Sequence, residues 1–235
     1  MNRSTLGVLV RRTFAHVRRH ALLFCCIAVA GIGVQWLLDT RFPGPGVELT
    51  AGIVAGAIVD AIVLGIVKGD VDGWNAAQTW DRIGERLWAV IIVNFVATYV
   101  AMFGLVSVAA GDLADRLLAI PTLLIAASVV FAEAIAVVAD DEAWWFVVVR
   151  AIGGSIRVAW SNGVFGRTIT LFVLQLVPGA ISSAIVGAVT HGHPPASSFW
   201  TDVPVGIVFS IPLDVLIVLA FFDASGYEPN RTCGE

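Results

Sequence analysis

The sequence predicts an all-α polytopic membrane protein with six transmembrane helices. Its long apolar stretches are each close to the ~20 residues that a helix needs to cross a hydrocarbon core. These predicted spans are residues 21–38, 47–67, 87–109, 117–138, 168–189 and 203–222. The composition agrees, because 58% of the residues are hydrophobic and only 14% are charged, whereas roughly a quarter are charged in soluble proteins.

Basic residues are distributed unevenly between the two sides of these spans. Twelve of the 14 Lys and Arg residues lie on the side that holds the N-terminus, and only Arg41 and Arg116 lie on the other side. Because basic loops stay in the cytoplasm, we expect a multi-pass inner-membrane protein with both termini cytoplasmic. The connections are too short and too apolar to fold separately, so residues 1–235 should form a single membrane domain.

Three segments of similar character precede the first, third and fifth predicted spans. Each contains an aromatic residue after a small or hydroxyl-bearing one, namely Phe14, Trp80 or Trp160. The third segment also carries Arg157 and is followed by Arg167. Aromatic rings and long cationic side chains are favoured at the headgroup layer. These five residues are therefore predicted to be interfacial.

A second similarity links the even-numbered spans. Residues 52–60 and 206–214 share the form Gly-Ile-Val-x-small-x-x-x-Asp, and the fourth span carries Glu133 at a comparable place. We therefore expect three repeats of an interfacial helix followed by a helical hairpin. The predicted repeat units are residues 1–70, 71–140 and 141–235.

Three acidic residues, Asp60, Glu133 and Asp214, lie within predicted spans. An ionised carboxylate at the centre of a membrane helix costs roughly 2.5–3.5 kcal/mol even on the translocon scale. No Lys or Arg lies near the middle of any predicted span. We therefore expect these acids to face protein and to be protonated and hydrogen-bonded, with Asn94 and Gln175 as candidate partners.

Small and helix-breaking residues lie near these acids. Gly52 and Gly56 share a helix face with Asp60, which predicts close helix packing at the acid. Pro178 and Pro212 are expected to interrupt the fifth and sixth spans, because proline frees a carbonyl about four residues earlier. A protonated carboxyl group near such a break could cap it.

The intramembrane acids allow three interpretations. In the first, they form a structural seam in a membrane protein that supports lipid or envelope homeostasis, or a partner, from its cytoplasmic face. In the second, Asp60, Glu133 and Asp214 line the route of a small proton- or cation-coupled transporter or channel. In the third, they bind a lipid or peptide headgroup. A water-accessible cavity that reaches at least two acids favours transport, whereas acids sealed by helix packing favour the structural role.

Four sequence motifs that mark common catalytic or nucleotide-binding sites are missing from the sequence. It has no HExxH, GxSxG, GxxxxGK[ST] or GxGxxG motif. His191 and His193 are near-adjacent in a Pro-rich loop, which makes a weak metal site. We expect no enzyme activity, catalytic residue, cofactor or bound metal. The expected partners are membrane lipids and either a partner protein or a second copy of the chain, and not nucleic acid, because topology already explains the basic N-terminal arm.

The middle of the chain carries a family resemblance. Ala-Ile-Pro-Thr-Leu-Leu-Ile at 119–125 is followed by Val-Val-Ala-Asp-Asp at 137–141 and by Ala-Ile-Gly-Gly-Ser-Ile-Arg-Val-Ala-Trp at 151–160, then by Gly163 and Arg167. This order resembles the six-helix membrane domain of some bacterial glycerophosphoryl diester phosphodiesterases and of stand-alone relatives. The resemblance implies a fold and a membrane location. It implies no active site, because the phosphodiesterase chemistry belongs to a separate soluble domain.

Overall fold

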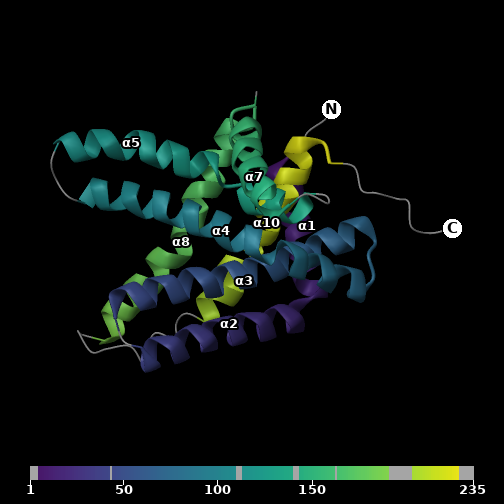
Figure 1. Ribbon diagram of the computed structural model, residues 1–235, viewed down its shortest axis with the longest axis horizontal. Helices are drawn as coiled ribbons and strands as arrows, with labels where there is room; N and C mark the ends of the chain where they lie inside the picture. The colour runs from purple at the N-terminus through teal and green to yellow at the C-terminus, as the bar shows by residue number, and fades with distance from the viewer. Residues whose placement is uncertain are drawn as a thin grey trace.

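The computed structural model describes residues 5–42, 44–109, 113–139, 143–161, 163–190 and 203–227, and every regular element in this part of the chain is a helix (Figure 1). The helices are α1 (Leu6–Arg19), α2 (Ala21–Arg41), α3 (Pro45–Asp72), α4 (Ala76–Ala109), α5 (Leu113–Ser128), α6 (Ala132–Val138), α7 (Trp144–Ala159), α8 (Phe165–Thr190), the π-helical turn η2 (Gly206–Ser210) and α10 (Ile211–Ser225). The predicted all-α class is confirmed for these residues.

Five described stretches are long and apolar enough to cross a bilayer, which indicates a multi-pass membrane protein. They are Ala21–Leu38, Leu49–Asp72, Ala76–Ala109, Asp115–Val138 and Val203–Ser225. Five of the six predicted spans thus coincide with stretches of membrane-spanning length. The predicted span 168–189 lies in α8, of which Phe165–Ile181 is a shorter apolar helix.

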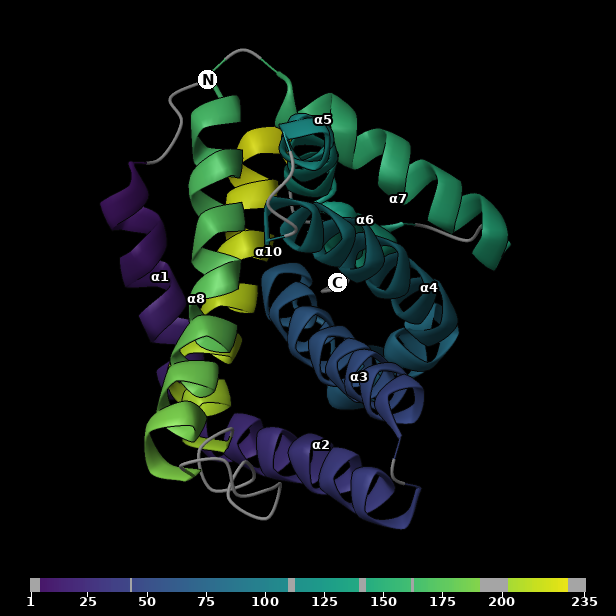
Figure 2. The ribbon, with the colours of Figure 1, turned by 90° about the vertical axis from the view of Figure 1, so that its left-hand side faces the viewer.

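Two antiparallel hairpins form the body of the molecule. α2 pairs with α3 and α4 pairs with α5, and α3 packs against α4 (Figure 1). Figure 2 shows α8 running alongside α10. The amphipathic helix α1 packs against α10, and α7 packs against α6 and the first part of α4. The segment around Trp80 and the third predicted span form one continuous helix of 34 residues.

Ion pairs gather at the end of the bundle that holds α1 and α7, which we name the charged end. Oδ2 of Asp70 lies 3.1 Å from Nδ1 of His16 and 2.7 Å from Nε2 of His20. Arg167 of α8 lies 2.9 Å from Oδ2 of Asp223 in α10. These contacts join α1 to α3 and α8 to α10.

Tyr227 joins the C-terminal segment to a buried ion pair within α3. Nζ of Lys68 donates to Oδ2 of Asp72 at 2.7 Å, and both side chains are almost fully buried. The Tyr227 hydroxyl accepts from Lys68 at 2.9 Å and donates to Asp72 at 2.9 Å. Trp74 places its ring 4.5 Å from the same ammonium group. Gly226, at φ 68°, lets the chain leave α10 and return Tyr227 to this pair.

The apolar core fills the half of the bundle next to the charged end. Its fully buried members include Val63, Val67, Val90, Val93, Ala136, Val215 and Val218. The opposite half, which we name the open end, contains the last turns of α4 and the first turns of α5. It exposes Phe103, Leu105, Val106, Leu117, Leu118 and Ile120. A contiguous exposed apolar surface of this kind fits contact with lipid rather than water.

Candidate functional site

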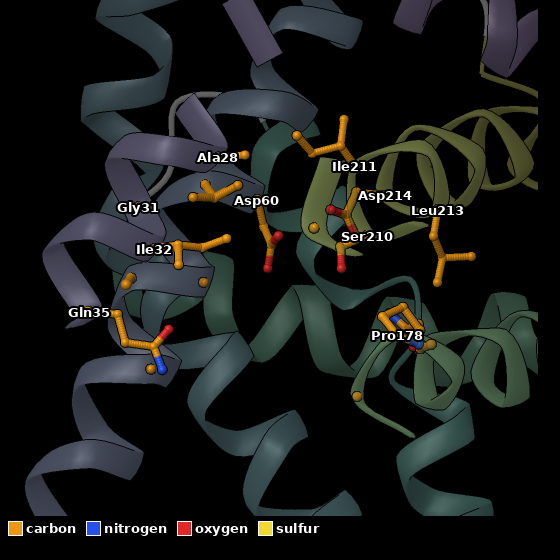
Figure 3. Close-up of a pocket in the computed structure, with 17 residues that line it drawn as sticks. Ala28, Gly31, Ile32, Gln35, Asp60, Pro178, Ser210, Ile211, Leu213 and Asp214 are labelled. Atoms are coloured by element: carbon orange, nitrogen blue, oxygen red, sulfur yellow. The ribbon is translucent and has the colours of Figure 1, made fainter. Parts of the chain in front are cut away.

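Four polar side chains from four helices meet in the middle of the bundle. Asp60 comes from α3, Glu133 from α6 and Asp214 from the first turn of α10. Nδ2 of Asn94, in α4, donates to Oδ2 of Asp60 and to Oε1 of Glu133, each at 3.0 Å. The Asp214 carboxyl faces the same space as the Asp60 carboxyl (Figure 3). We name these four residues the acid cluster.

Asn94 connects two acids of the acid cluster. A carboxyl group accepts hydrogen bonds whether or not it is ionised, so both acids can accept from the same amide. Asn94 supplies two hydrogens, and it directs them to Asp60 and Glu133. Oγ1 of Thr98 in turn donates to Oδ1 of Asn94 at 3.3 Å, which fixes the orientation of the amide.

A break in the fourth predicted span positions Glu133. α5 ends at Ser128 and α6 begins at Ala132, so Glu133 follows directly after a non-helical turn. Oγ of Ser155, in α7, accepts from the Phe131 amide at 3.1 Å and donates to the Ser128 carbonyl at 2.8 Å. Irregular backbone at membrane depth is tolerated when protein groups satisfy it in this way.

Trp160 completes this arrangement. Its indole Nε1 donates to Oγ of Ser128 at 2.7 Å, although more than half of the residue is exposed. The prediction that Trp160 is interfacial therefore omits its second role as a contact to the broken span. Nothing at residues 129–131, which are Val, Val and Phe, indicates a break, because these residues neither lack an amide hydrogen nor favour a turn.

The two prolines behave differently from each other. Pro212 lies in the first turn of α10, directly after the π-helical turn η2, so the sixth span is irregular just before Asp214 as expected. Pro178 lies inside α8, which continues as a helix from Phe165 to Thr190. The prediction that Pro178 interrupts the fifth span is therefore wrong. A proline inside a helix can be accommodated by a local bend without ending it.

Two cavities reach the acid cluster. The first, with a volume of about 370 Å³, lies between α2, α3, α8 and the η2–α10 segment (Figure 3). Because five glycines line it, we name it the glycine cavity. The second, with a volume of about 290 Å³, lies between α4, α5, α6 and α8, and we name it the Asn94 cavity. Asp60, Gln175 and Asp214 line both cavities, and Glu133 lines the second.

The glycines next to Asp60 do not all serve close packing. A Cβ atom added at Gly31 would meet Val59 at 2.5 Å, and one at Gly52 would meet the Gln35 amide at 3.1 Å. A Cβ atom added at Gly56 would meet no atom within 4 Å, because Gly56 borders the glycine cavity. The prediction of close helix packing is therefore wrong at Gly56, where the missing side chain makes open space instead.

The charged side chains that line the two cavities are acidic. Neither cavity is lined by a Lys, Arg or His side chain among the residues that the structure describes. In the same part of the chain no group of three His, Cys, Asp or Glu side chains is arranged to hold a metal ion. Gln35 and Ser210, which sequence reasoning did not select as polar candidates, also face the glycine cavity (Figure 3).

The predicted interfacial residues lie at the charged end. Phe14 and Trp80 are among the exposed aromatic residues, and Arg157 in the last turn of α7 is also exposed. Arg167 instead pairs with Asp223. The near-adjacent histidines His191 and His193 lie outside the described residues.

The comparisons with protein-family models, with curated proteins and with solved structures found no match to this chain. The likeness to the phosphodiesterase-associated membrane domain therefore stays a prediction. Function has to be argued from the acid cluster and its two cavities.

Proposed function

We propose that this chain is a six-span inner-membrane transporter that carries protons, or another cation, through Asp60, Glu133 and Asp214. The observation that carries the proposal is that two cavities meet at these acids. In this proposal the charged end and both termini face the cytoplasm, α8 supplies the remaining span, and the interfacial helices with their hairpins form three repeats.

The size of the cavities supports transport over a sealed structural seam. Volumes of about 370 and 290 Å³ exceed the ~30 Å³ that one water molecule occupies in the liquid. Both cavities contain carboxyl, amide or hydroxyl groups that bind water, and apolar voids of this size would be expected to stay dry. Hydrated acids can exchange protons with solvent, which acids sealed by helix packing cannot do.

The direction of the cavities supports access from one side. From Asp60 the glycine cavity extends to Gly52 and Gln35, and the Asn94 cavity extends to Met102 and Leu105, all toward the open end. On the other side of the acids, the valines of α3, α4 and α10 are fully buried. The arrangement resembles one half of an alternating-access cycle, in which the acids are reached from outside and closed from the cytoplasm.

Irregular helices next to the acids support the same proposal. Glu133 follows the α5–α6 break and Asp214 follows η2. Transporters commonly place ion sites near the bilayer midplane on discontinuous helices, whose breaks also permit movement. A rearrangement at the α5–α6 break would move Glu133 relative to Asn94 and could open the route toward the charged end.

The structural interpretation is the second candidate, and one contact favours it. Asn94 donates to two acids, as expected of a seam that only satisfies buried carboxyl groups. In that case the protein has no transported substrate and supports lipid or envelope homeostasis, or a partner, through its cytoplasmic face. Both candidates are non-enzymatic and both place the chain among membrane lipids.

Proton flux in proteoliposomes distinguishes the two candidates. The full chain is reconstituted into vesicles that contain a pH-sensitive dye, and a potassium gradient with valinomycin sets the membrane potential. The transport proposal predicts protein-dependent acidification of the lumen when the interior is negative. Flux equal to that of protein-free vesicles under proton, sodium and potassium gradients would contradict it and favour the structural candidate.

A further inference from the structure

We propose that the glycine cavity binds a primary alkylammonium ion, with its ammonium group at the Asp60 and Asp214 carboxylates. The inference rests on the proposed function, because it names the class of cation that the same acids would carry. In Figure 3 the two carboxyl groups face the same space, with Ser210 beside Asp214 and Gln35 on the opposite wall.

The polar groups of the cavity match a primary ammonium group. Carboxylates, a hydroxyl oxygen and amide oxygens can all accept hydrogen bonds, and a primary ammonium group donates three. A quaternary ammonium group donates none and is usually recognised by aromatic faces. No aromatic side chain lines the glycine cavity among the described residues. The chemistry therefore favours a primary amine over a quaternary one.

The walls of the cavity match an apolar body attached to that ammonium group. Ala28, Ile32, Val59, Ile211 and Leu213 supply aliphatic surface, and glycines supply the rest. A volume of about 370 Å³ lies within the ~300–1,000 Å³ range of small-molecule sites. A proton or a bare monovalent ion would need no such space. A short alkyl chain would fill it and displace water from apolar walls.

The second cavity gives the displaced proton a separate path. An ammonium ion that binds at Asp60 and Asp214 replaces the positive charge of a proton shared within the acid cluster. That proton can pass to water in the Asn94 cavity, which Asp60, Asp214 and Glu133 also line. One ammonium ion can thus take the place of one proton at the cluster, and without an amine the same acids can still take up and release protons.

Binding of n-pentylammonium to the purified full chain tests the proposal. Tritiated n-pentylamine at neutral pH is the labelled ligand, and pentan-1-ol and pentyltrimethylammonium are the competitors. We expect saturable binding that unlabelled n-pentylammonium displaces and that both competitors displace about tenfold more weakly or worse. Non-saturable binding, or equal displacement by pentan-1-ol, would overturn the proposal.

Gly56→Leu fills the cavity, and Gly84→Leu is its matched control. Each glycine lies in a helix and has room for a Cβ atom, but Gly84 is exposed on α4 and far from the cavity lining. We expect Gly56→Leu to weaken n-pentylammonium binding about tenfold or more and Gly84→Leu to leave it unchanged. Equal binding by two variants that both unfold at the temperature of the parent would overturn the proposal.

Amine binding and proton transport can be tested separately. Proton flux without added amine tests the proposed function by itself. Flux without saturable n-pentylammonium binding would overturn the amine site and leave the transporter. Saturable binding that Gly56→Leu abolishes would support the amine site even if flux were absent.

Discussion

The side-chain amide of Asn94 donates to the Asp60 carboxyl at 3.0 Å across the interface of α3 and α4. The same amide nitrogen lies 3.0 Å from Glu133, so one residue connects two of the three intramembrane acids. The Thr98 hydroxyl donates to the Asn94 amide oxygen and so holds the orientation of the amide.

Replacing Asn94 by Leu should destabilise the protein by ~1–2 kcal/mol, because it removes the donor to both acids. Thermal unfolding in detergent, followed by the loss of the helical circular dichroism signal, measures the change. Phe95→Leu is the neighbouring control, because Phe95 is exposed and lies outside the acid cluster. Equal melting temperatures for Asn94→Leu and the parent would show that the amide contributes nothing to stability.

Ser155→Ala should loosen the break in the fourth span. Ser155 is fully buried and holds the Phe131 amide and the Ser128 carbonyl, so its loss should cost about 1–3 kcal/mol. Hydrogen exchange read by mass spectrometry should show faster exchange in peptides that cover residues 128–133. Ser161→Ala is the control, since that hydroxyl donates locally to the Val158 carbonyl. Unchanged exchange at the break would mean that α7 does not hold it.

Lys68→Met should cost about 3–5 kcal/mol, because it leaves the Asp72 carboxylate buried without its cation. The double variant Lys68→Met with Asp72→Leu should recover part of this loss, since it leaves no unpaired charge. Denaturation by increasing mole fraction of SDS in mixed micelles measures both. A double variant less stable than Lys68→Met alone would contradict the assignment of a buried ion pair.

Topology can be tested by cysteine labelling in intact cells, in a background without Cys25, Cys26 and Cys233. Cysteines introduced at positions 45, 112 and 197 should react with an impermeant maleimide, because the positive-inside rule places these connections outside. Cysteines at positions 73 and 234 should react only after the membrane is permeabilised. Labelling at position 73 in intact cells would reverse the orientation.

The sequence predicts the membrane class and the residues of the acid cluster well. Long apolar stretches can be recognised from composition alone. An acid within such a stretch has to face protein, so Asp60, Glu133 and Asp214 could be selected before their contacts were known. Asn94 follows from the same argument, because an amide inside a span needs a partner as well.

The break between α5 and α6 could not be predicted, since its groups are bonded by Ser155 and Trp160 from another helix and no Gly or Pro lies at the break itself. The cavity at Gly56 was missed for a related reason. A glycine on a helix face allows either close approach or open space, and only the position of the facing helix decides between them. Here α2 and α3 approach each other closely at Gly31 and Gly52, whereas Gly56 faces the space beside α8.

The most direct test of the account is proton flux through Asp60→Asn, Glu133→Gln and Asp214→Asn in proteoliposomes. Each amide keeps the size of the acid and can still make hydrogen bonds, but it cannot carry a proton. The account predicts that all three variants purify and melt like the parent while protein-dependent flux falls to the level of empty vesicles. Flux at the level of the parent in all three stable variants would contradict the account and leave the acids a structural role.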